Sequence, residues 1–265
     1  MILDAILANT RRELEERKQR VPLSELARAA SDARAPLAFA PALRAPGVSI
    51  IAEVKRRSPS GGEIRPGASA ADLAAMYARG GASAISVLTD SRYFGGSAED
   101  LVAAKHTADL PTLRKDFIVD PYQVYEARAM GADAVLLIVR ALAAAELRDL
   151  LALTHDFGFA ALVETHNASE VEAALDAGAE IVGVNNRDLD TLVTDVSLAP
   201  KLRRLVPADR VFVAESGISQ PDQIAALARE NVDAVLIGES LLRSDDPPGK
   251  LQALVAAGAP ARAGR

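Results

Sequence analysis

Four segments of the chain repeat one pattern, in which a glycine or asparagine ends an alanine-rich stretch and a short apolar run follows at once. They occupy residues 81–87, 131–137, 178–184 and 231–237, so their starts are 50, 47 and 53 residues apart. Glycine and asparagine tolerate the left-handed conformation that ends a helix, and a fully buried strand is a short continuous apolar run. Each repeat therefore predicts a helix followed by a buried strand.

Four more apolar runs, at 48–54, 110–114, 159–163 and 211–214, alternate with the repeats. Together they predict eight strands, which start near residues 48, 84, 110, 133, 159, 180, 211 and 233. A helical segment follows each strand, at 69–79, 98–107, 121–130, 143–156, 168–177, 197–205, 220–230 and 248–257. Eight such units predict a closed parallel (β/α)8 barrel. An open doubly wound sheet is the alternative, but no G-x-G-x-x-G motif follows the first strand.

The residues before the first strand, 1–47, predict an N-terminal helical extension. Apolar residues recur at helical spacing in residues 1–20, and a second short helix is predicted at 22–31. The three prolines and the glycine of residues 35–47 favour a connector. No linker is visible within 48–257, so we expect residues 1–265 to form a single domain.

The composition limits the possible functions. A net charge of −6 and the lack of a long basic run argue against nucleic-acid or membrane partners. The absence of cysteine excludes disulfides, thiolate metal sites and a cysteine nucleophile, and the three histidines lack metal-ligand spacing, so we expect no metal. Neither a signal peptide nor a membrane-spanning apolar run is visible, so we expect a cytoplasmic protein.

Charged and polar side chains follow the apolar runs at the C-terminal ends of the predicted strands, where barrels carry their active sites. Glu53 and Lys55 end the first strand two residues apart, and therefore point to the same face. Five more such residues end later strands: Lys115, Glu164, Asn185, Arg187 and Glu215. Burying unpaired charges is costly, so two lysines and three glutamates that converge from separate strands predict a reactive site.

Small residues follow the last two predicted strands, namely Ser216, Gly217, Gly238, Glu239 and Ser240. Each group precedes a helical segment, where free backbone N–H groups and the helix dipole favour an anion, and barrels commonly bind phosphate there. Ser58 and Ser60 of the first loop would add hydroxyl donors. We therefore expect a phosphorylated small-molecule substrate, with ordinary helix capping as the alternative.

Other polar residues near the strand ends are expected to have structural roles. Asp116 and Asp188 are predicted to pair with Arg114 and Arg187, and Arg56 and Arg57 to form a solvated rim. His166 is predicted to lie on the surface near the mouth of the barrel.

These segments together resemble the indole-3-glycerol-phosphate synthase family. The matching motifs lie, in order, at 53–60, 86–90 with 94–97, 113–118, 163–164, 185–189, 214–218 and 237–240. The likeness covers essentially the whole chain. It implies a TIM (β/α)8 barrel with an N-terminal helical extension that helps to cover its mouth. It also implies conversion of 1-(2-carboxyphenylamino)-1-deoxyribulose 5-phosphate to indole-3-glycerol phosphate, carbon dioxide and water, in tryptophan biosynthesis and without a cofactor.

The resemblance implies roles for five catalytic residues. Lys115 would protonate the ketone oxygen of the substrate, and Glu164 would perform the acid–base work of the dehydration, together with Lys55. Lys55 would also hold the substrate carboxylate, with Glu53 and Glu215 setting its charge state. We expect burial or nearby positive charge to lower the pKa of the donor lysine.

Three further residues would bind the substrate. Asn185 and Arg187 would contact its hydroxyl and carboxylate groups, and Phe117 would pack against the anthranilate ring. The expected assembly is a monomer.

Two other functions remain open. One is a Schiff-base aldolase on the same barrel, with Lys115 or Lys55 as the nucleophile. The other is a phosphate-binding barrel without catalysis, which would need the phosphate loops but not both lysines. A sister isomerase of the same pathway would, by resemblance, use a cysteine base, and the chain contains none.

Overall fold

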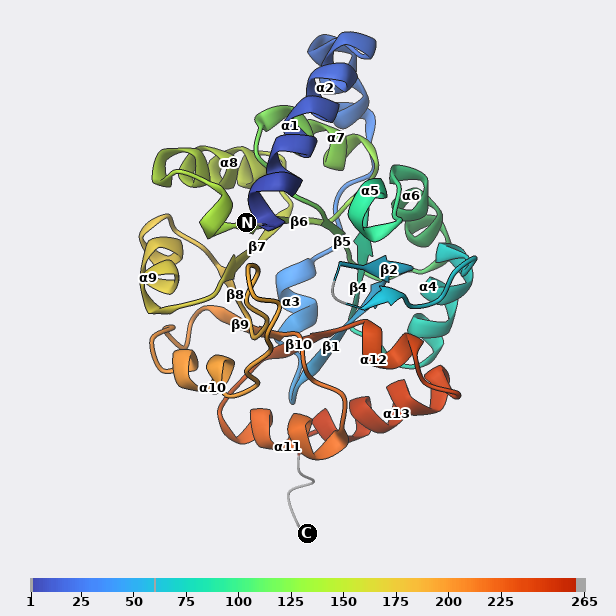
Figure 1. Cartoon of the computed structure of the whole chain (residues 1–265), viewed down its shortest axis with the longest axis vertical. Coiled ribbons are helices and arrows are strands. Elements are labelled where there is room, and N and C mark those ends of the chain that lie inside the picture. Colours follow the sequence, from blue (N-terminus) through green and yellow to red (C-terminus); the bar gives the residue numbers. More distant parts are fainter. Residues whose placement is uncertain (1, 60, 261–265) are drawn as a thin grey trace.

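The protein is a closed barrel of eight parallel strands, as seen in a computed structural model that describes residues 2–59 and 61–260 (Figure 1). The strands are β1 (Ser49–Val54), β4 (Ala84–Leu88), β5 (Thr112–Lys115), β6 (Ala134–Ile138), β7 (Ala160–Thr165), β8 (Ile181–Asn185), β9 (Val211–Glu215) and β10 (Ala234–Ile237). Hydrogen bonds between β1 and β10 close the ring. The predicted barrel is confirmed, and each predicted strand start lies within two residues of the observed one.

Eight helices form the outer ring of the barrel. They are α4 (Ala70–Arg79), α6 (Ala98–Thr107), α7 (Pro121–Ala129), α8 (Ala144–Asp156), α9 (Ala168–Asp176), α10 (Leu198–Arg203), α11 (Pro221–Arg229) and α13 (Pro247–Gly258). Several begin where a side chain accepts a hydrogen bond from a backbone N–H of the first turn, as Ser97 and Asn167 do. These helices confirm the predicted alternation of strands and helices.

Short elements that the sequence did not predict lie in the loops after the strands. They are the hairpin β2 (Arg57–Ser58) and β3 (Gly62–Glu63), the helices α5 (Ser91–Phe94) and α12 (Glu239–Leu242), and the 3-10 turn η1 (Val139–Ala141). Elements of two to four residues are too short to carry a periodic apolar pattern, so they could not be predicted from the sequence.

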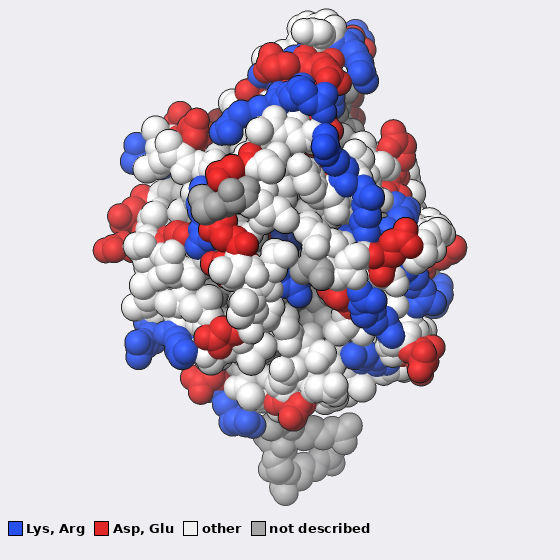
Figure 2. Space-filling model, viewed as in Figure 1, with Lys and Arg blue, Asp and Glu red and all other residues white. Residues whose placement is uncertain are grey.

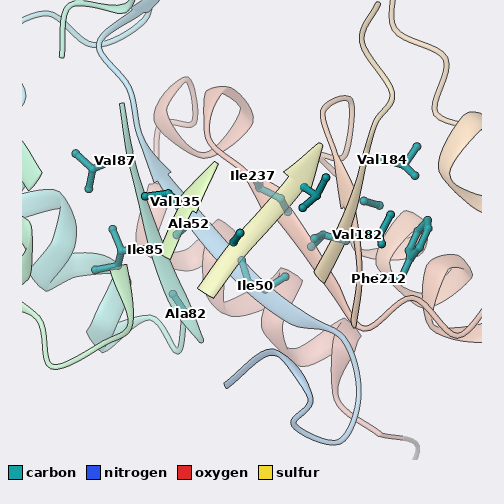
Figure 3. Packing of buried hydrophobic residues seen from close by; sticks show 14 of the residues in the cluster. Ile50, Ala52, Ala82, Ile85, Val87, Val135, Val182, Val184, Phe212 and Ile237 are labelled. Carbon is teal, nitrogen blue, oxygen red and sulfur yellow. The ribbon is translucent and has the colours of Figure 1, made fainter. Parts of the chain in front are cut away.

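Each strand of the barrel is buried on both faces. Outward residues such as Ile50, Val182 and Phe212 belong to the cluster that packs against the helices (Figure 3). Inward residues such as Ile51 and Leu113 belong to a second cluster that fills the barrel. This double burial explains why the strands appear in the sequence as continuous apolar runs.

The N-terminal extension contacts both ends of the barrel. It consists of α1 (Ile2–Arg20), α2 (Leu23–Asp32) and α3 (Phe39–Leu43). Helix α1 lies at the mouth, α2 contacts α7, and α3 lies inside the ring of strands in the view of Figure 1. Phe39 and Leu43 are buried in the same interior cluster as Ile51 and Ala234, near the N-terminal ends of the strands.

The prediction of a connector at residues 35–47 was therefore wrong for residues 39–43. A helix forms there because its two large apolar side chains fill the floor of the barrel, and this packing outweighs the prolines. Pro41 lies in the first turn of α3, where its missing N–H costs no helical hydrogen bond.

In the parts of the chain that the structure describes, none of the helices combines the length and apolar character that crossing a membrane requires.

Candidate active site

Four alternate strands, β1, β5, β7 and β9, each place one ionisable side chain inside the barrel. In each strand, the ionisable residue follows a buried aliphatic residue of the interior by two positions. The two side chains therefore point to the same face of the strand, toward the inside of the barrel. The four residues are Glu53, Lys115, Glu164 and Glu215. Barrel interiors are filled in layers of four side chains from alternate strands. In this protein the layer nearest the mouth is ionisable, whereas the layer below it is aliphatic.

The charges of this layer are paired at short range. Lys115 Nζ lies 2.7 Å from Glu164 Oε2 and 3.0 Å from Glu215 Oε2, and both carboxylates are buried. Lys55 Nζ lies 2.6 Å from Glu53 Oε1. Glu215 thus pairs with Lys115 and not with Lys55, contrary to expectation.

The environment shifts the pKa values of the central three groups. Burial lowers the pKa of Lys115, but the carboxylates of Glu164 and Glu215 outweigh it and leave this pKa raised. Burial raises the pKa of Glu164, but Lys115 and His166 outweigh it and leave this pKa lowered. Burial and the neighbouring Glu164 raise the pKa of Glu215 to about 7, against the opposing effect of Lys115. The expected lowering of the lysine pKa is therefore wrong, because the two carboxylates hold Lys115 as a cation.

Two glycines on neighbouring strands leave room for these carboxylates. A Cβ atom on Gly183 would stand 2.4 Å from Glu215 Oε1, and one on Gly238 would stand 2.5 Å from Glu53 Oε1. This role of Gly183 was not predicted. A glycine inside an apolar strand often marks such a close approach, so the signal was present.

The layer forms the floor of a cavity of about 440 Å³ at the mouth of the barrel. Figure 2 shows the mouth as a hollow near the middle of the face, with Lys or Arg atoms visible inside it. One wall is apolar and includes Phe94 and Phe117, whose ring centroids are 6.1 Å apart. Ile2 and Leu3 of α1 also line the cavity, so the N-terminal extension contributes to the site.

The opposite side of the cavity is formed by the loops after β9 and β10. Ser216, Gly217, Gly238, Glu239 and Ser240 all line it. Ser216 and Gly217 have φ angles of 65° and 78°, and a Cβ atom on Gly217 would stand 2.6 Å from Thr194 Cγ2. The Ser240 hydroxyl donates a hydrogen bond to the carbonyl oxygen of Ile218, 3.2 Å away, and links the two loops.

The remaining predicted substrate-binding residues also lie near the cavity. Asn185 Nδ2 donates to Glu164 Oε1 at 3.2 Å, and Arg187 lines the mouth with its Nε 3.2 Å from Thr194 Oγ1. Ser58 lines the cavity and accepts a hydrogen bond from the Gly61 N–H at 3.0 Å. Ser60 lies outside the residues that the structure describes.

Three predictions about neighbouring charges can be compared with the structure. Asp116 pairs with Arg114 at 2.9 Å, as expected. The prediction for Asp188 was wrong, because its carboxylate lies 3.6 Å from Arg140, which follows β6, two strands away from β8 in the barrel. The prediction that Arg56 lies on a solvated rim was also wrong, because its side chain is partly buried and lies 2.5 Å from Asp100.

The surface position predicted for His166 was wrong as well. Its side chain is only 2% exposed and lies between Glu164 and Glu170. His166 follows Glu164 by two residues at the end of β7, and the period of two along a strand was the signal that could have placed it beside that carboxylate.

Comparisons with known proteins agree with this geometry. The family model described as "Indole-3-glycerol phosphate synthase" matches residues 3–254. A relative of that name from Nocardioides sp. is 51% identical over 95% of this chain and 96% of its own. A relative of the same name from Kineococcus radiotolerans is 50% identical over 97% of this chain and 96% of its own. Another from Dehalococcoides mccartyi is 46% identical over 96% of this chain and 100% of its own.

Two solved structures share the fold. Thiamine phosphate pyrophosphorylase from Pyrococcus furiosus superposes with a TM-score of 0.60 at 16% identity, over 79% of this chain and 95% of that one. A structure described as native KDPGal superposes with a TM-score of 0.54 at 18% identity, over 78% and 93%. At these identities the likeness concerns the barrel alone.

Proposed function

The chain belongs to the indole-3-glycerol phosphate synthase family, a family of carboxy-lyases in tryptophan biosynthesis, and from this premise we propose how its strand-end cavity performs the reaction. The substrate is 1-(2-carboxyphenylamino)-1-deoxyribulose 5-phosphate, which carries a carboxylate and a phosphate. The single observation that supports the proposal is the ionisable layer, which faces one cavity between an apolar wall and two loops suited to phosphate.

The first step forms a carbon–carbon bond between the ring carbon that bears the carboxylate and the ketone carbon. The ketone oxygen gains negative charge as this bond forms, so it needs a proton donor. Lys115 is the proposed donor, because two adjacent carboxylates keep its ammonium group charged. Glu215, whose pKa is raised to about 7, lies 3.0 Å away and can return a proton to Lys115.

The second step breaks the bond between the ring carbon and the carboxylate and releases carbon dioxide. The electron pair of that bond restores the aromatic ring. Before this step the substrate carboxylate needs a cationic partner. Lys55 and Arg187 both line the cavity and are the proposed partners, with Glu53 holding Lys55 in place at 2.6 Å. Phe94 and Phe117 are proposed to pack against the ring.

The last step removes the new hydroxyl as water, while the adjacent carbon loses a proton to form the double bond of the indole. Glu164 is the proposed base that takes the proton from carbon, because its lowered pKa keeps it ionised near neutral pH. Lys55, which lines the cavity, is the proposed donor of the proton with which the hydroxyl leaves as water. Asn185 donates a hydrogen bond to Glu164 at 3.2 Å and can also bind a substrate hydroxyl.

The phosphate is proposed to bind at the loops after β9 and β10, with Ser58 and Ser60 adding hydroxyl groups. We also propose that residues 1–265 form one domain in which the extension 1–47 completes the site. All proposed site residues come from one chain, which supports a monomer. We further propose that it acts in the cytoplasm and needs no cofactor.

The test of the proposed function is a direct assay. The purified protein is mixed with the carboxyphenylamino substrate, and indole fluorescence is expected to rise without added metal or cofactor. A stable adduct after borohydride treatment would instead favour the Schiff-base aldolase. Binding of the substrate without turnover would favour a non-catalytic phosphate-binding barrel.

Ser216→Asp is expected to weaken substrate binding. Its carboxylate would stand beside the proposed phosphate, and like charges brought together cost several kcal/mol, so KM should rise roughly 100-fold. Ser216→Asn is the matched control, since asparagine has nearly the same size, carries no charge and also tolerates the φ of 65°. If both variants raise KM equally, size and not charge is responsible, and the phosphate does not bind at Ser216.

A further inference from the structure

His166 lies directly after β7 and is buried. Among the residues that the structure describes, it is not part of the cavity lining, so it has no direct place in the reaction proposed above. A histidine whose side chain is 2% exposed and which stands beside a catalytic carboxylate nevertheless requires an explanation.

Both ring nitrogens of His166 face carboxylate oxygens. Nδ1 lies 3.1 Å from Glu170 Oε2, within hydrogen-bond distance. Nε2 is buried without a hydrogen bond among the described residues, and Glu164 Oε1 lies 3.4 Å from it, within ion-pair distance. A neutral imidazole has one N–H donor and one acceptor nitrogen, so it would turn a lone pair toward one of the two carboxylates. Only the imidazolium has a proton for each of them. The geometry therefore favours a positively charged ring.

Glu170 fixes the position of this ring. Its Oε2 also accepts a hydrogen bond from the backbone N–H of His166 at 2.8 Å, and its Oε1 accepts from Asn167 Nδ2 at 2.7 Å and Arg140 Nε at 3.2 Å. The carboxylate belongs to the first turn of α9, which is part of the scaffold. The charges thus alternate without interruption from Arg140 through Glu170, His166 and Glu164 to Lys115.

We propose that His166 is a positioning residue, a second positive charge that holds the Glu164 carboxylate through Oε1 while Lys115 holds it through Oε2. This inference rests on the acid–base role proposed for Glu164. When Lys115 gives its proton to the substrate, Glu164 loses one of its two cationic partners. His166 then remains beside the carboxylate, keeps it ionised and keeps it aimed at the cavity until it accepts a proton.

The titration of His166 depends on the groups that surround it. Glu164 of β7 and Glu170 of α9 face it directly, and Arg140 lies behind Glu170. Burial lowers the pKa of His166, but the two carboxylates outweigh it and raise the pKa to about 9. Its contribution to the free energy of unfolding is therefore complete below the ordinary pKa near 6.5 and is lost as the pH rises through about 9.

The test compares His166→Gln with His155→Gln, an equivalent change at an exposed histidine of α8. Loss of a positive charge this close should raise the pKa of Glu164, and the acid limb of the kcat–pH profile should move up by about one pH unit or more. KM should change by less than about twofold, because the ring does not line the cavity. His155→Gln should leave the profile unchanged.

A merely structural role would give a different result. It would lower kcat by the same factor at every pH, without moving the acid limb, and this outcome would overturn the proposal. If His166→Gln fails to fold, His166→Asn serves in its place, because it also removes the positive charge beside Glu164. The same upward shift is expected. No shift would again contradict the proposal.

A second measurement does not depend on activity. Histidine ring signals followed by NMR should include one that titrates near pH 9 and is missing from His166→Gln. A wild-type protein that does not turn over the substrate would contradict the proposed function. Normal turnover with an unshifted acid limb in the variant would contradict the role of His166 alone.

Discussion

Lys115→Met should lower kcat by roughly 10²–10⁴-fold, the usual contribution of one proton transfer. Methionine matches the length of lysine but has no proton to give to the ketone oxygen, so ring closure would have to take a proton from water. The phosphate loops and the apolar wall are unchanged, so substrate binding should persist. The measurement is single-turnover kinetics, which separates chemistry from binding.

The control is Lys201→Met, at an exposed lysine of α10 whose side chain is 62% accessible. It should keep wild-type kcat.

Lys115→Met should also leave the fold intact but change how its stability depends on pH. Without the shared cation, the pKa of the buried Glu215 should rise further above that of the unfolded chain, because burial raises it and Lys115 no longer opposes burial. The variant should therefore lose stability as the pH rises. Near-normal turnover in Lys115→Met would refute the assignment of the proton donor.

Glu164→Gln should have a comparable effect, again roughly 10²–10⁴-fold on kcat. Glutamine keeps the shape of the side chain and can still accept from Lys115, but it cannot accept a proton from the carbon next to the departing hydroxyl. Ring closure and loss of carbon dioxide come before this step. A cyclised intermediate should accumulate in the variant, and quenched reactions analysed by mass spectrometry would detect it.

Glu172→Gln, on the exposed face of α9, is the matched control and should behave like the wild type. Two results would contradict the role of Glu164. One is a normal rate, and the other is a variant that stops before carbon dioxide is released, which would place Glu164 at an earlier step.

The barrel was predictable because each of its strands is buried on both faces and four of the helix stops, at residues 81, 131, 178 and 231, are marked by glycine or asparagine. The convergence of Glu53, Lys115 and Glu164 was predictable from the same pattern, since a polar residue two positions after an inward aliphatic one must also point inward. These inferences need only the periodicity of a strand and the rule that barrel sites lie at the C-terminal ends of strands.

Partners across the barrel were not predictable. The pairing of Glu215 with Lys115 depends on the radius and tilt of the barrel, and the pairing of Asp188 with Arg140 depends on the path of a loop. The burial of His166 depends on where α9 begins relative to β7. Spacing along the sequence describes only the local geometry of one strand or helix. Each of these contacts is instead set by how separate elements pack against one another.

The position of α3 has a consequence for the order of events during synthesis. Phe39 and Leu43 leave the ribosome before the strands of the barrel, and α3 contacts β1 and β4, the first two of these strands. The interior cluster that buries both side chains also includes residues of later strands, such as Ala234 of β10. Their full burial must therefore wait until the last strand has been made, which places closure of the barrel floor late in folding.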